Sequence, residues 1–238
     1  MKTAPVQPTA SRSWLSGVAR AWPILLGYVP VGFAFGVLSQ KAGLSTFNTL
    51  ALSIVVYAGS AQLIAVGLFA ASAPALSIVL TTFIVNLRHL LFSAALSPYL
   101  RGWRRSEIAA FAYQLTDETF AVHAGHFATG DWTKPQVFAV NLTAQITWVL
   151  GTWLGLIAGG LITDVRPLAL DYALPAMFIG LLVLQIRNRV QIAVAILTGL
   201  LALGLVLVGV DQWNVIIATL IGATVGVGVE QWIKRRSS

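Results

Sequence analysis

The sequence contains no cysteine and little charge. Of its 238 residues, 10% are charged and 57% are hydrophobic, and the mean hydropathy is +0.81. Without cysteine the chain has no disulfide bond and no thiolate metal site, and the absence does not indicate whether its compartment is oxidising or reducing. Soluble globular domains carry about 25% charged residues. The composition therefore excludes an ordinary soluble domain and indicates a protein whose surroundings are a lipid bilayer.

The sequence also lacks a block of basic residues that could bind nucleic acid. The formal net charge is +7, but the basic residues lie between or outside the apolar segments, as the positive-inside rule describes. No nucleic-acid partner is predicted. No short apolar run with a cleavage site opens the chain. We expect a polar N-terminal tail with an interfacial segment over 1–20 and a basic tail over 234–238, with both termini in the cytoplasm.

Eight apolar segments account for most of the chain. Several approach the length of about 20 residues that spans a bilayer core. The predicted fold is therefore an all-α polytopic membrane protein with a single helical transmembrane domain over 21–233. Six or eight crossings fit two cytoplasmic termini, because some segments can be re-entrant where protein or water satisfies their backbone. The segments cover 22–40, 46–71, 73–99, 107–127, 135–162, 172–186, 190–209 and 212–233.

Small residues recur at every fourth position in three of these segments. Such spacing allows two helices to approach closely, and plain packing is the interpretation we favour. The three sets are Gly32/Gly36, Gly151/Gly155/Gly159 and Ala218/Gly222/Gly226.

Two segments carry helix-breaking residues in similar surroundings, Tyr28-Val29-Pro30 in the first and Tyr172-Ala173-Leu174-Pro175 in the sixth. Interrupted segments in matching positions of two halves point to a transporter binding site. We expect both segments to be broken, and an internal two-fold repeat and a chance match both remain open. The second segment contains Tyr57-Ala58-Gly59-Ser60-Ala61-Gln62, which suits a helix that loosens and exposes backbone to a ligand.

Ionisable residues occur near the middle of two neighbouring segments, as Asn86-Leu87-Arg88-His89 and as Thr116-Asp117-Glu118. Three charges facing lipid would cost about 8–10 kcal/mol on insertion scales, so they must face protein, water or one another. Arg88 is expected to pair with Asp117 or Glu118, which leaves the other carboxyl group protonated or hydrogen-bonded. Such residues indicate a transport pathway, and an ion pair that only fixes helix packing is the alternative.

Motifs for catalysis and metal binding are absent from the sequence. It has no His-Glu-x-x-His pair and no Gly-x-Ser-x-Gly elbow, so no enzyme, metal site or cofactor is predicted. A lone histidine inside a membrane is more often a hydrogen-bonded helix contact than a ligand or a relay, and we expect the same of His89. His123 and His126 are expected at the membrane interface.

Seven runs of residues carry a family resemblance. They are Gly27–Gly36 (GYVPVGFAFG), Ala42–Ser45 (AGLS), Val56–Gln62 (VYAGSAQ), Val85–His89 (VNLRH), Ser97–Arg101 (SPYLR), Leu115–Glu118 (LTDE) and Leu170–Ala176 (LDYALPA). On these runs the chain resembles the AzlC family, the large subunits of bacterial branched-chain amino acid exporters. The similarity runs in order through nearly all of residues 17–232, and the Asn-Leu-Arg-His and Thr-Asp-Glu runs are its most specific part.

The resemblance implies a permease that moves valine, leucine and isoleucine, with methionine as a further substrate, out of the cell across the bacterial cytoplasmic membrane. It also implies a small hydrophobic partner subunit of the AzlD type. Secondary transport coupled to an ion or a proton is the hypothesis we favour. The alternatives are a membrane scaffold or sensor subunit that does not transport, and a channel.

The hypothesis places the substrate between the two segments that we expect to be broken. Tyr28 and Tyr172 would frame an apolar side-chain pocket, Arg88 suits the substrate carboxylate, and Asp117 or Glu118 suits its ammonium group or a coupling proton. The expected pathway residues are Tyr28, Pro30, Tyr57, Ser60, Gln62, Asn86, Arg88, His89, Asp117, Glu118, Tyr172 and Pro175.

Overall fold

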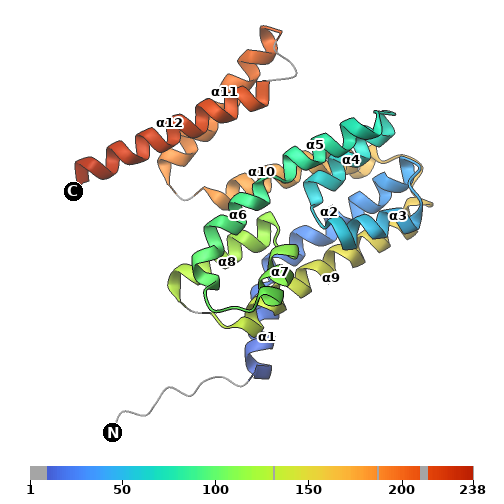
Figure 1. Cartoon of the computed structure of the whole chain (residues 1–238). Coiled ribbons are helices and arrows are strands. Elements are labelled where there is room, and N and C mark those ends of the chain that lie inside the picture. Colours follow the sequence, from blue (N-terminus) through green and yellow to red (C-terminus); the bar gives the residue numbers. More distant parts are fainter. Residues whose placement is uncertain (1–9, 131, 187, 210–213, 238) are drawn as a thin grey trace. The chain divides into compact units, whose positions relative to one another are not determined.

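The computed structural model describes residues 10–130, 132–186, 188–209 and 214–237. Within these residues all regular structure is helical, which confirms the predicted all-α class. Two compact units are present, Met1–Leu181 and Leu182–Ser238 (Figure 1). In bilayer surroundings a helix is favoured because it satisfies its own backbone hydrogen bonds.

The first unit contains most of the helices and all of the residues discussed as a site below. In chain order its elements are α1 (Ala10–Arg20), α2 (Trp22–Lys41), α3 (Thr46–Ala51), the π-helix η1 (Leu52–Val56), α4 (Gly59–Ala70), α5 (Ala75–Asn86), α6 (Arg88–Leu96), the 3-10 helix η2 (Ser97–Leu100), α7 (Arg105–Tyr113), α8 (Asp117–Thr129), α9 (Lys134–Gly159), η3 (Arg166–Leu168), η4 (Leu170–Tyr172) and most of α10 (Ala173–Gln185).

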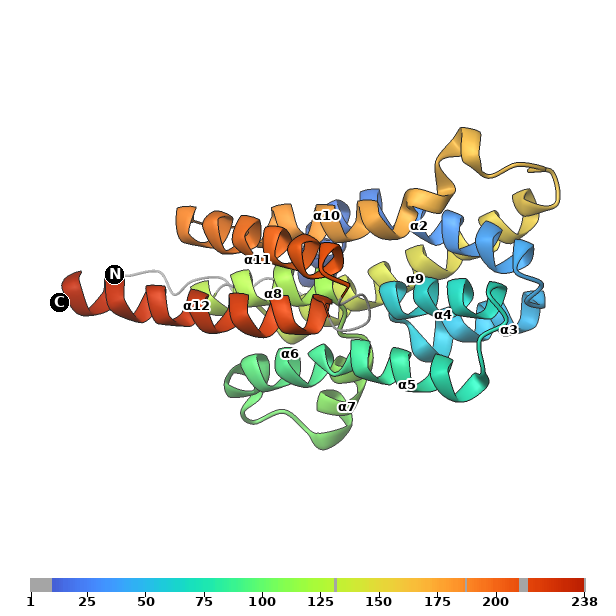
Figure 2. The same ribbon diagram turned by 90° about the horizontal axis from the view of Figure 1, so that it is seen from above.

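The centre of this unit is the pair α2 and α9, which lie side by side in both views (Figures 1 and 2). Their backbones touch through glycine. A Cβ atom added to Gly155 would lie 2.9 Å from the carbonyl carbon of Phe33, and one added to Gly36 would lie 2.9 Å from the nitrogen of Leu156. The close contact predicted from the small-residue spacing is therefore confirmed for these two helices.

The expected break in the first segment is wrong. α2 runs without interruption from Trp22 to Lys41, with Pro23 in its first turn and Pro30 in its interior. Pro23 costs little because the first N–H groups of a helix have no partner within it. Pro30 faces away from the core, and the long contact of α2 with α9 holds the helix together across the missing hydrogen bond.

The expected break in the sixth segment is also wrong. α10 is continuous over Ala173–Gln185, and Pro175 lies in its first turn, where proline is tolerated. Pro30 and Pro175 therefore occupy different positions in their helices, one internal and one near a start. They do not form the matched pair of interruptions that the two similar runs suggested.

The helices of the second and fourth segments are the ones that break. η1 ends at Val56, the Tyr57 backbone after it is left-handed with φ 43° and ψ 48°, and α4 starts anew at Gly59. The loosening expected in the second segment is thus confirmed. α7 and α8 are separated between Tyr113 and Asp117. Between α5 and α6 only Leu87 forms an irregular turn, and its backbone stays in the right-handed helical region, so the helical stretch continues through it.

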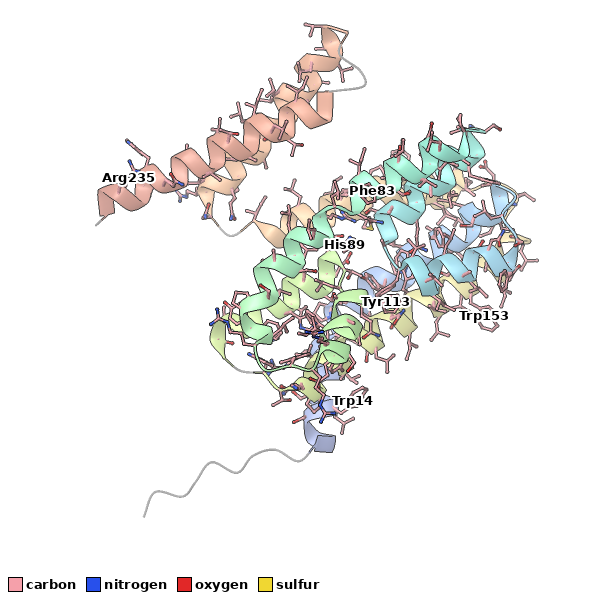
Figure 3. The ribbon with its side chains drawn as sticks, in the orientation of Figure 1. Trp14, Phe83, His89, Tyr113, Trp153 and Arg235 are labelled. Carbon is pink, nitrogen blue, oxygen red and sulfur yellow. The ribbon has the colours of Figure 1, made fainter. Side chains whose placement is uncertain are left out.

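Four helical stretches are long and apolar enough to cross a membrane among the described residues: Trp22–Lys41, Ala75–Leu100, Lys134–Gly159 and Arg189–Leu207. Large apolar side chains cover their outer faces, such as Phe83, which is 62% exposed, and Trp153 (Figure 3). Lipid would cover such a surface.

The second unit consists of the end of α10 together with α11 (Arg189–Leu207) and α12 (Asn214–Ser237). α11 and α12 pack on each other, and a Cβ atom at Gly222 would lie 3.1 Å from Cβ of Thr198. The small-residue contact predicted for 212–233 is therefore confirmed as well.

Candidate functional site

The two helix breaks of the first unit, after Tyr57 and before Asp117, meet at one small polar cavity. Its volume is about 10 Å³, so it has room for roughly one water. We call it the polar cavity, and its lining consists of Tyr28, Tyr57, Ala58, Gly59, Ser60, His89, Thr116, Asp117, Glu118, Trp148 and Met177.

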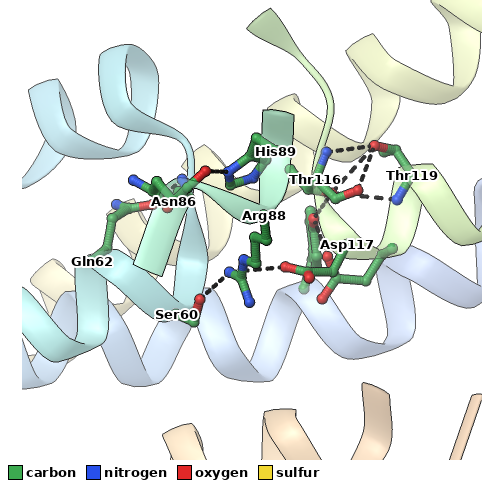
Figure 4. Close-up of polar contacts among 11 residues, drawn as sticks. Ser60, Gln62, Asn86, Arg88, His89, Thr116, Asp117 and Thr119 are labelled. Atoms are coloured by element: carbon green, nitrogen blue, oxygen red, sulfur yellow. Dashed lines mark hydrogen bonds and ion pairs between the residues drawn. The ribbon is translucent and has the colours of Figure 1, made fainter. Parts of the chain in front are cut away.

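Arg88 connects two of the broken helices at this cavity. Its Nη2 atom lies 2.9 Å from the Asp117 Oδ2 atom, and the same nitrogen donates a hydrogen bond to the Ser60 hydroxyl (Figure 4). The pair of Arg88 with Asp117 is one of the two pairings that the sequence left open. Because the side chains of Arg88 and Asp117 are 21% and 11% exposed, the pair is well shielded from water.

Glu118 has a different partner from its neighbour. The Tyr28 hydroxyl donates to Glu118 Oε2 at 2.8 Å and lies 2.6 Å from Thr116 Oγ1. Since the single Tyr28 proton goes to the carboxylate, Thr116 donates to Tyr28. No ion pair of Glu118 occurs in the described part of the chain. The two adjacent carboxyl groups thus differ: one is charge-paired, and the other is held by a hydroxyl.

Both carboxyl groups begin a helix, which explains their placement. Asp117 and Glu118 form the first turn of α8, and Thr116 is its N-cap, accepting from the Thr119 backbone N–H at 3.3 Å. Carboxylates are favourable at a helix N-terminus because of the helix dipole. The motif therefore starts a helix and supplies the cavity with negative charge at the same time.

Gln62 bridges the break before α4. Its side-chain oxygen accepts from the Ala58 N–H at 3.2 Å, and its amide nitrogen donates to Ser53 Oγ at 3.3 Å. Ser53 in turn lies 2.9 Å from Thr152 Oγ1, which donates to the Trp148 carbonyl at 2.9 Å. This chain of hydrogen bonds ties the broken helix to α9, and Gln62 itself is not part of the cavity wall.

Asn86 and His89 flank the irregular turn at Leu87, between α5 and α6. His89 Nδ1 donates to the Asn86 carbonyl at 3.1 Å, so its other ring nitrogen is the one left for the cavity. The side-chain oxygen of Asn86 is buried and has no hydrogen-bond partner among the described residues. His89 is therefore a helix contact, as expected, and it also forms part of the cavity wall.

Three of the expected pathway residues lie elsewhere. The Tyr172 side chain is 65% exposed, and Pro30 and Pro175 are exposed as well. None of the three lines the polar cavity. The pocket expected between Tyr28 and Tyr172 is therefore not formed, because Tyr28 is buried in the wall of the polar cavity, whereas Tyr172 ends the short helix η4 with its side chain exposed.

Trp148 and Met177 line the cavity and were not expected there. Trp148 is 1% exposed and packs edge-on against Tyr28, with ring centroids 5.2 Å apart. A signal existed for Trp148, since most tryptophans of the chain lie at the segment ends and this one lies in the middle of a segment. A tryptophan away from the interfacial belt needs another reason for its position.

A second set of buried polar side chains lies between α1, α8 and α9. His123 is 2% exposed and its Nε2 atom donates to Asn141 Oδ1 at 2.7 Å, while Arg20 donates to His126 Nδ1 at 2.7 Å. The expected interfacial position is therefore wrong for His123, because α8 packs that face onto α9 instead of ending at a membrane surface. No group of three metal-binding side chains occurs in the described ranges.

Comparison with known proteins places the chain in a family. The family model described as AzlC protein matches residues 23–162. The chain is 28% identical over 234 residues to the inner membrane protein YgaZ of Escherichia coli K12, covering 95% of this chain and 93% of that protein. It is 30% identical over 214 residues to an uncharacterized membrane protein of Archaeoglobus fulgidus, covering 89% and 93%.

A further relative has a name that states a substrate. The branched-chain amino acid transport protein AzlC of Bacillus subtilis is 24% identical over 193 residues, which cover 80% of this chain and 75% of that protein. No solved structure matches the chain.

Proposed function

The chain belongs to the AzlC family, and from that premise we propose that it is a secondary transporter that exports branched-chain amino acids. A role in membrane transport follows from the family and from the named relative, which also speak for a transporter over an enzyme. The proposed substrates are valine, leucine, isoleucine and methionine. The proposed location is the bacterial cytoplasmic membrane, with both termini in the cytoplasm.

The polar cavity is the observation that carries the proposal. Its wall holds two carboxyl groups and the aromatic rings of Tyr28, Tyr57 and Trp148. The Arg88 guanidinium binds two side chains of that wall, Asp117 and Ser60. A zwitterion with an apolar side chain needs both charge signs next to apolar surface. As it stands, the cavity has room for about one water molecule. Substrate binding would therefore take place in a more open form, in which the contacts of Arg88 rearrange.

We assign the coupling role to Glu118 and not to Asp117. Asp117 is neutralised by Arg88, whereas Glu118 has the Tyr28 hydroxyl as its partner and faces the same cavity. A buried carboxyl group without a cation can exist in the neutral form, which makes it suitable for carrying a proton. We expect Glu118→Gln to remove coupling, so that exchange of valine persists while uphill export driven by a proton gradient falls about tenfold or more.

A small AzlD-type subunit is the proposed partner. Joint expression followed by purification through a tag on the large chain tests it directly: a stoichiometric small hydrophobic subunit supports the assignment. Full transport by the large chain alone would contradict it.

Counterflow of labelled valine in vesicles tests the central proposal. Vesicles that contain the chain and its partner and are loaded with unlabelled valine should accumulate the label transiently. A scaffold or sensor subunit would give none, and a channel would give flux that does not saturate and does not distinguish valine from polar amino acids.

A further inference from the structure

Two helix N-termini face the polar cavity, and only one of them has a side-chain cap and acidic residues in its first turn. The start of α8 is capped by Thr116 and carries its own two carboxyl groups. The start of α4 has Ala58 at its N-cap position, with no side-chain cap and no acidic residue in its first turn within the described part of the chain. Because the first N–H groups of a helix lack partners inside it, the N-terminus of α4 retains unused donors and a partial positive charge.

Two buried side chains add further unused donors at the same place. The Tyr57 hydroxyl and the Trp148 indole nitrogen have no hydrogen-bond partner among the described residues, although their side chains are only 2% and 1% exposed. Both residues line the polar cavity. Trp148 packs against the start of α4 with the six-membered edge of its ring, since a Cβ atom at Gly59 would be 2.8 Å from Cη2, and its nitrogen belongs to the five-membered part of the same ring. An indole nitrogen can only donate, so the group that it lacks is an acceptor.

The position of Arg88 points to the same missing partner. It donates to Ser60, the second residue of α4, which places a cation beside the positive end of a helix. Such a placement is unfavourable unless negative charge lies nearby. Asp117 supplies that charge to Nη2, the same nitrogen that donates to Ser60. The Nε atom of Arg88 is buried and has no hydrogen-bond partner among the described residues, so the guanidinium can still donate to another acceptor.

We propose that the N-terminus of α4 is the subsite for the carboxylate group of the transported solute. The N–H groups of Gly59 and Ser60, the Tyr57 hydroxyl and the Trp148 indole N–H bind it, and Arg88 lies beside it. This assignment rests on the proposed function. The sequence suggested Arg88 as the main carboxylate ligand. The N-terminus of α4 takes that role instead, because the Arg88 guanidinium already binds Asp117 and Ser60.

Ligand analogues combined with one conservative variant test the subsite. Valinol keeps the ammonium group and side chain of valine and replaces the carboxylate by an alcohol. In wild-type vesicles with the partner present, valinol should inhibit labelled valine counterflow at least tenfold more weakly than valine does. Tyr57→Phe removes one hydroxyl and should weaken valine about tenfold, the value of one hydrogen bond to a charged group, while valinol is unchanged.

Tyr99→Phe is the matched control. Tyr99 lies in η2, is 40% exposed and does not line the polar cavity, so its loss of a hydroxyl should leave both ligands unchanged. The ratio of valine to valinol inhibition is taken within each variant, which cancels any loss of folded protein.

Two results would overturn the proposal, and they differ from each other. If the ratio is unchanged in Tyr57→Phe and is lost in Arg88→Lys, the carboxylate binds at Arg88; transport then stands and the α4 subsite is wrong. If wild-type vesicles show no valine counterflow, the proposed function fails and the subsite fails with it.

Discussion

The first unit contains continuous helices and broken helices, and they contribute different things to the polar cavity. α2 and α9 are unbroken and touch each other through glycine. The helix pairs on either side of Tyr57 and of Thr116 stop and restart where they meet the cavity. A continuous helix satisfies its own backbone and offers only side chains, here the rings of Tyr28 and Trp148. A broken helix also offers free N–H groups, so polar ligands are bound where helices break.

The largest effect is expected from Arg88→Ala, which acts on the broken helices alone. It leaves the Asp117 carboxyl group without its ion pair, and loss of one partner of a buried pair costs about 3–5 kcal/mol. Valine transport should fall more than 100-fold, and the thermal unfolding temperature in detergent should drop. Both are measured on the same purified preparation.

The double variant Arg88→Ala/Asp117→Ala separates structure from function. We expect it to recover most of the unfolding temperature and none of the transport. Recovery of transport would mean that the pair only fixes helix packing.

A smaller effect is expected from Gly155→Ala, which acts on the continuous pair. The new methyl group would lie 2.9 Å from the carbonyl carbon of Phe33, so α2 and α9 must separate, at a cost of about 1–3 kcal/mol. Gly67→Ala in α4 is the control, because a Cβ atom there meets nothing within 4 Å. Chemical unfolding of the two variants should show destabilisation by the first only; equal stability would contradict the close contact.

A still smaller effect is expected where the two regions are joined. Thr152→Val removes the hydroxyl that links Ser53 of η1 to α9 and should cost about 1 kcal/mol of unfolding free energy. Thr147→Val is the matched control, since Thr147 Oγ1 bonds only to the Thr143 carbonyl of its own helix in the described chain. Hydrogen exchange at Leu52–Val56 should accelerate in Thr152→Val and stay unchanged in the control.

The smallest effect is expected at the start of α9, where Lys134 pairs with Glu107 of α7 at 2.7 Å. The hydrogen bond from Lys134, and then that from the Arg104 N–H, lower the pKa of the Glu107 carboxyl group below its usual 4.5. A lowered carboxyl pKa stabilises the folded state above the ordinary pKa, and this stabilisation is lost as the pH falls through the folded value.

The unfolding temperature of Glu107→Gln should therefore lie slightly below that of the wild type at pH 7, and the difference should shrink as the pH falls below 4.5 and through the lower pKa of the folded protein. High salt should also reduce it, because the pair is exposed. A difference that grows in acid would contradict the assignment.

Sequence patterns predicted the fold class and most of the site, and they failed where packing decides. The pairing of Arg88 with one of the two carboxyl groups followed from charge, and the loosening of the second segment near Tyr57 followed from a run of small and polar residues. The breaks at Pro30 and Pro175 did not occur. Proline disfavours a helix interior by about 3 kcal/mol, and the contact of α2 with α9 outweighs that cost at Pro30, while Pro175 lies where no cost arises.

The sequence by itself determined that this protein is helical, lies in a membrane and carries charged residues that must avoid lipid, because composition and hydropathy set those properties along the chain. It also determined that α2 and α9 could approach closely, since glycine spacing is a local property. Only the tertiary structure decided that Arg88 binds Asp117 while Glu118 binds Tyr28. It also decided that Trp148 lines the cavity. These contacts join residues far apart in the sequence, and the packing of whole helices selects among partners with similar local chemistry.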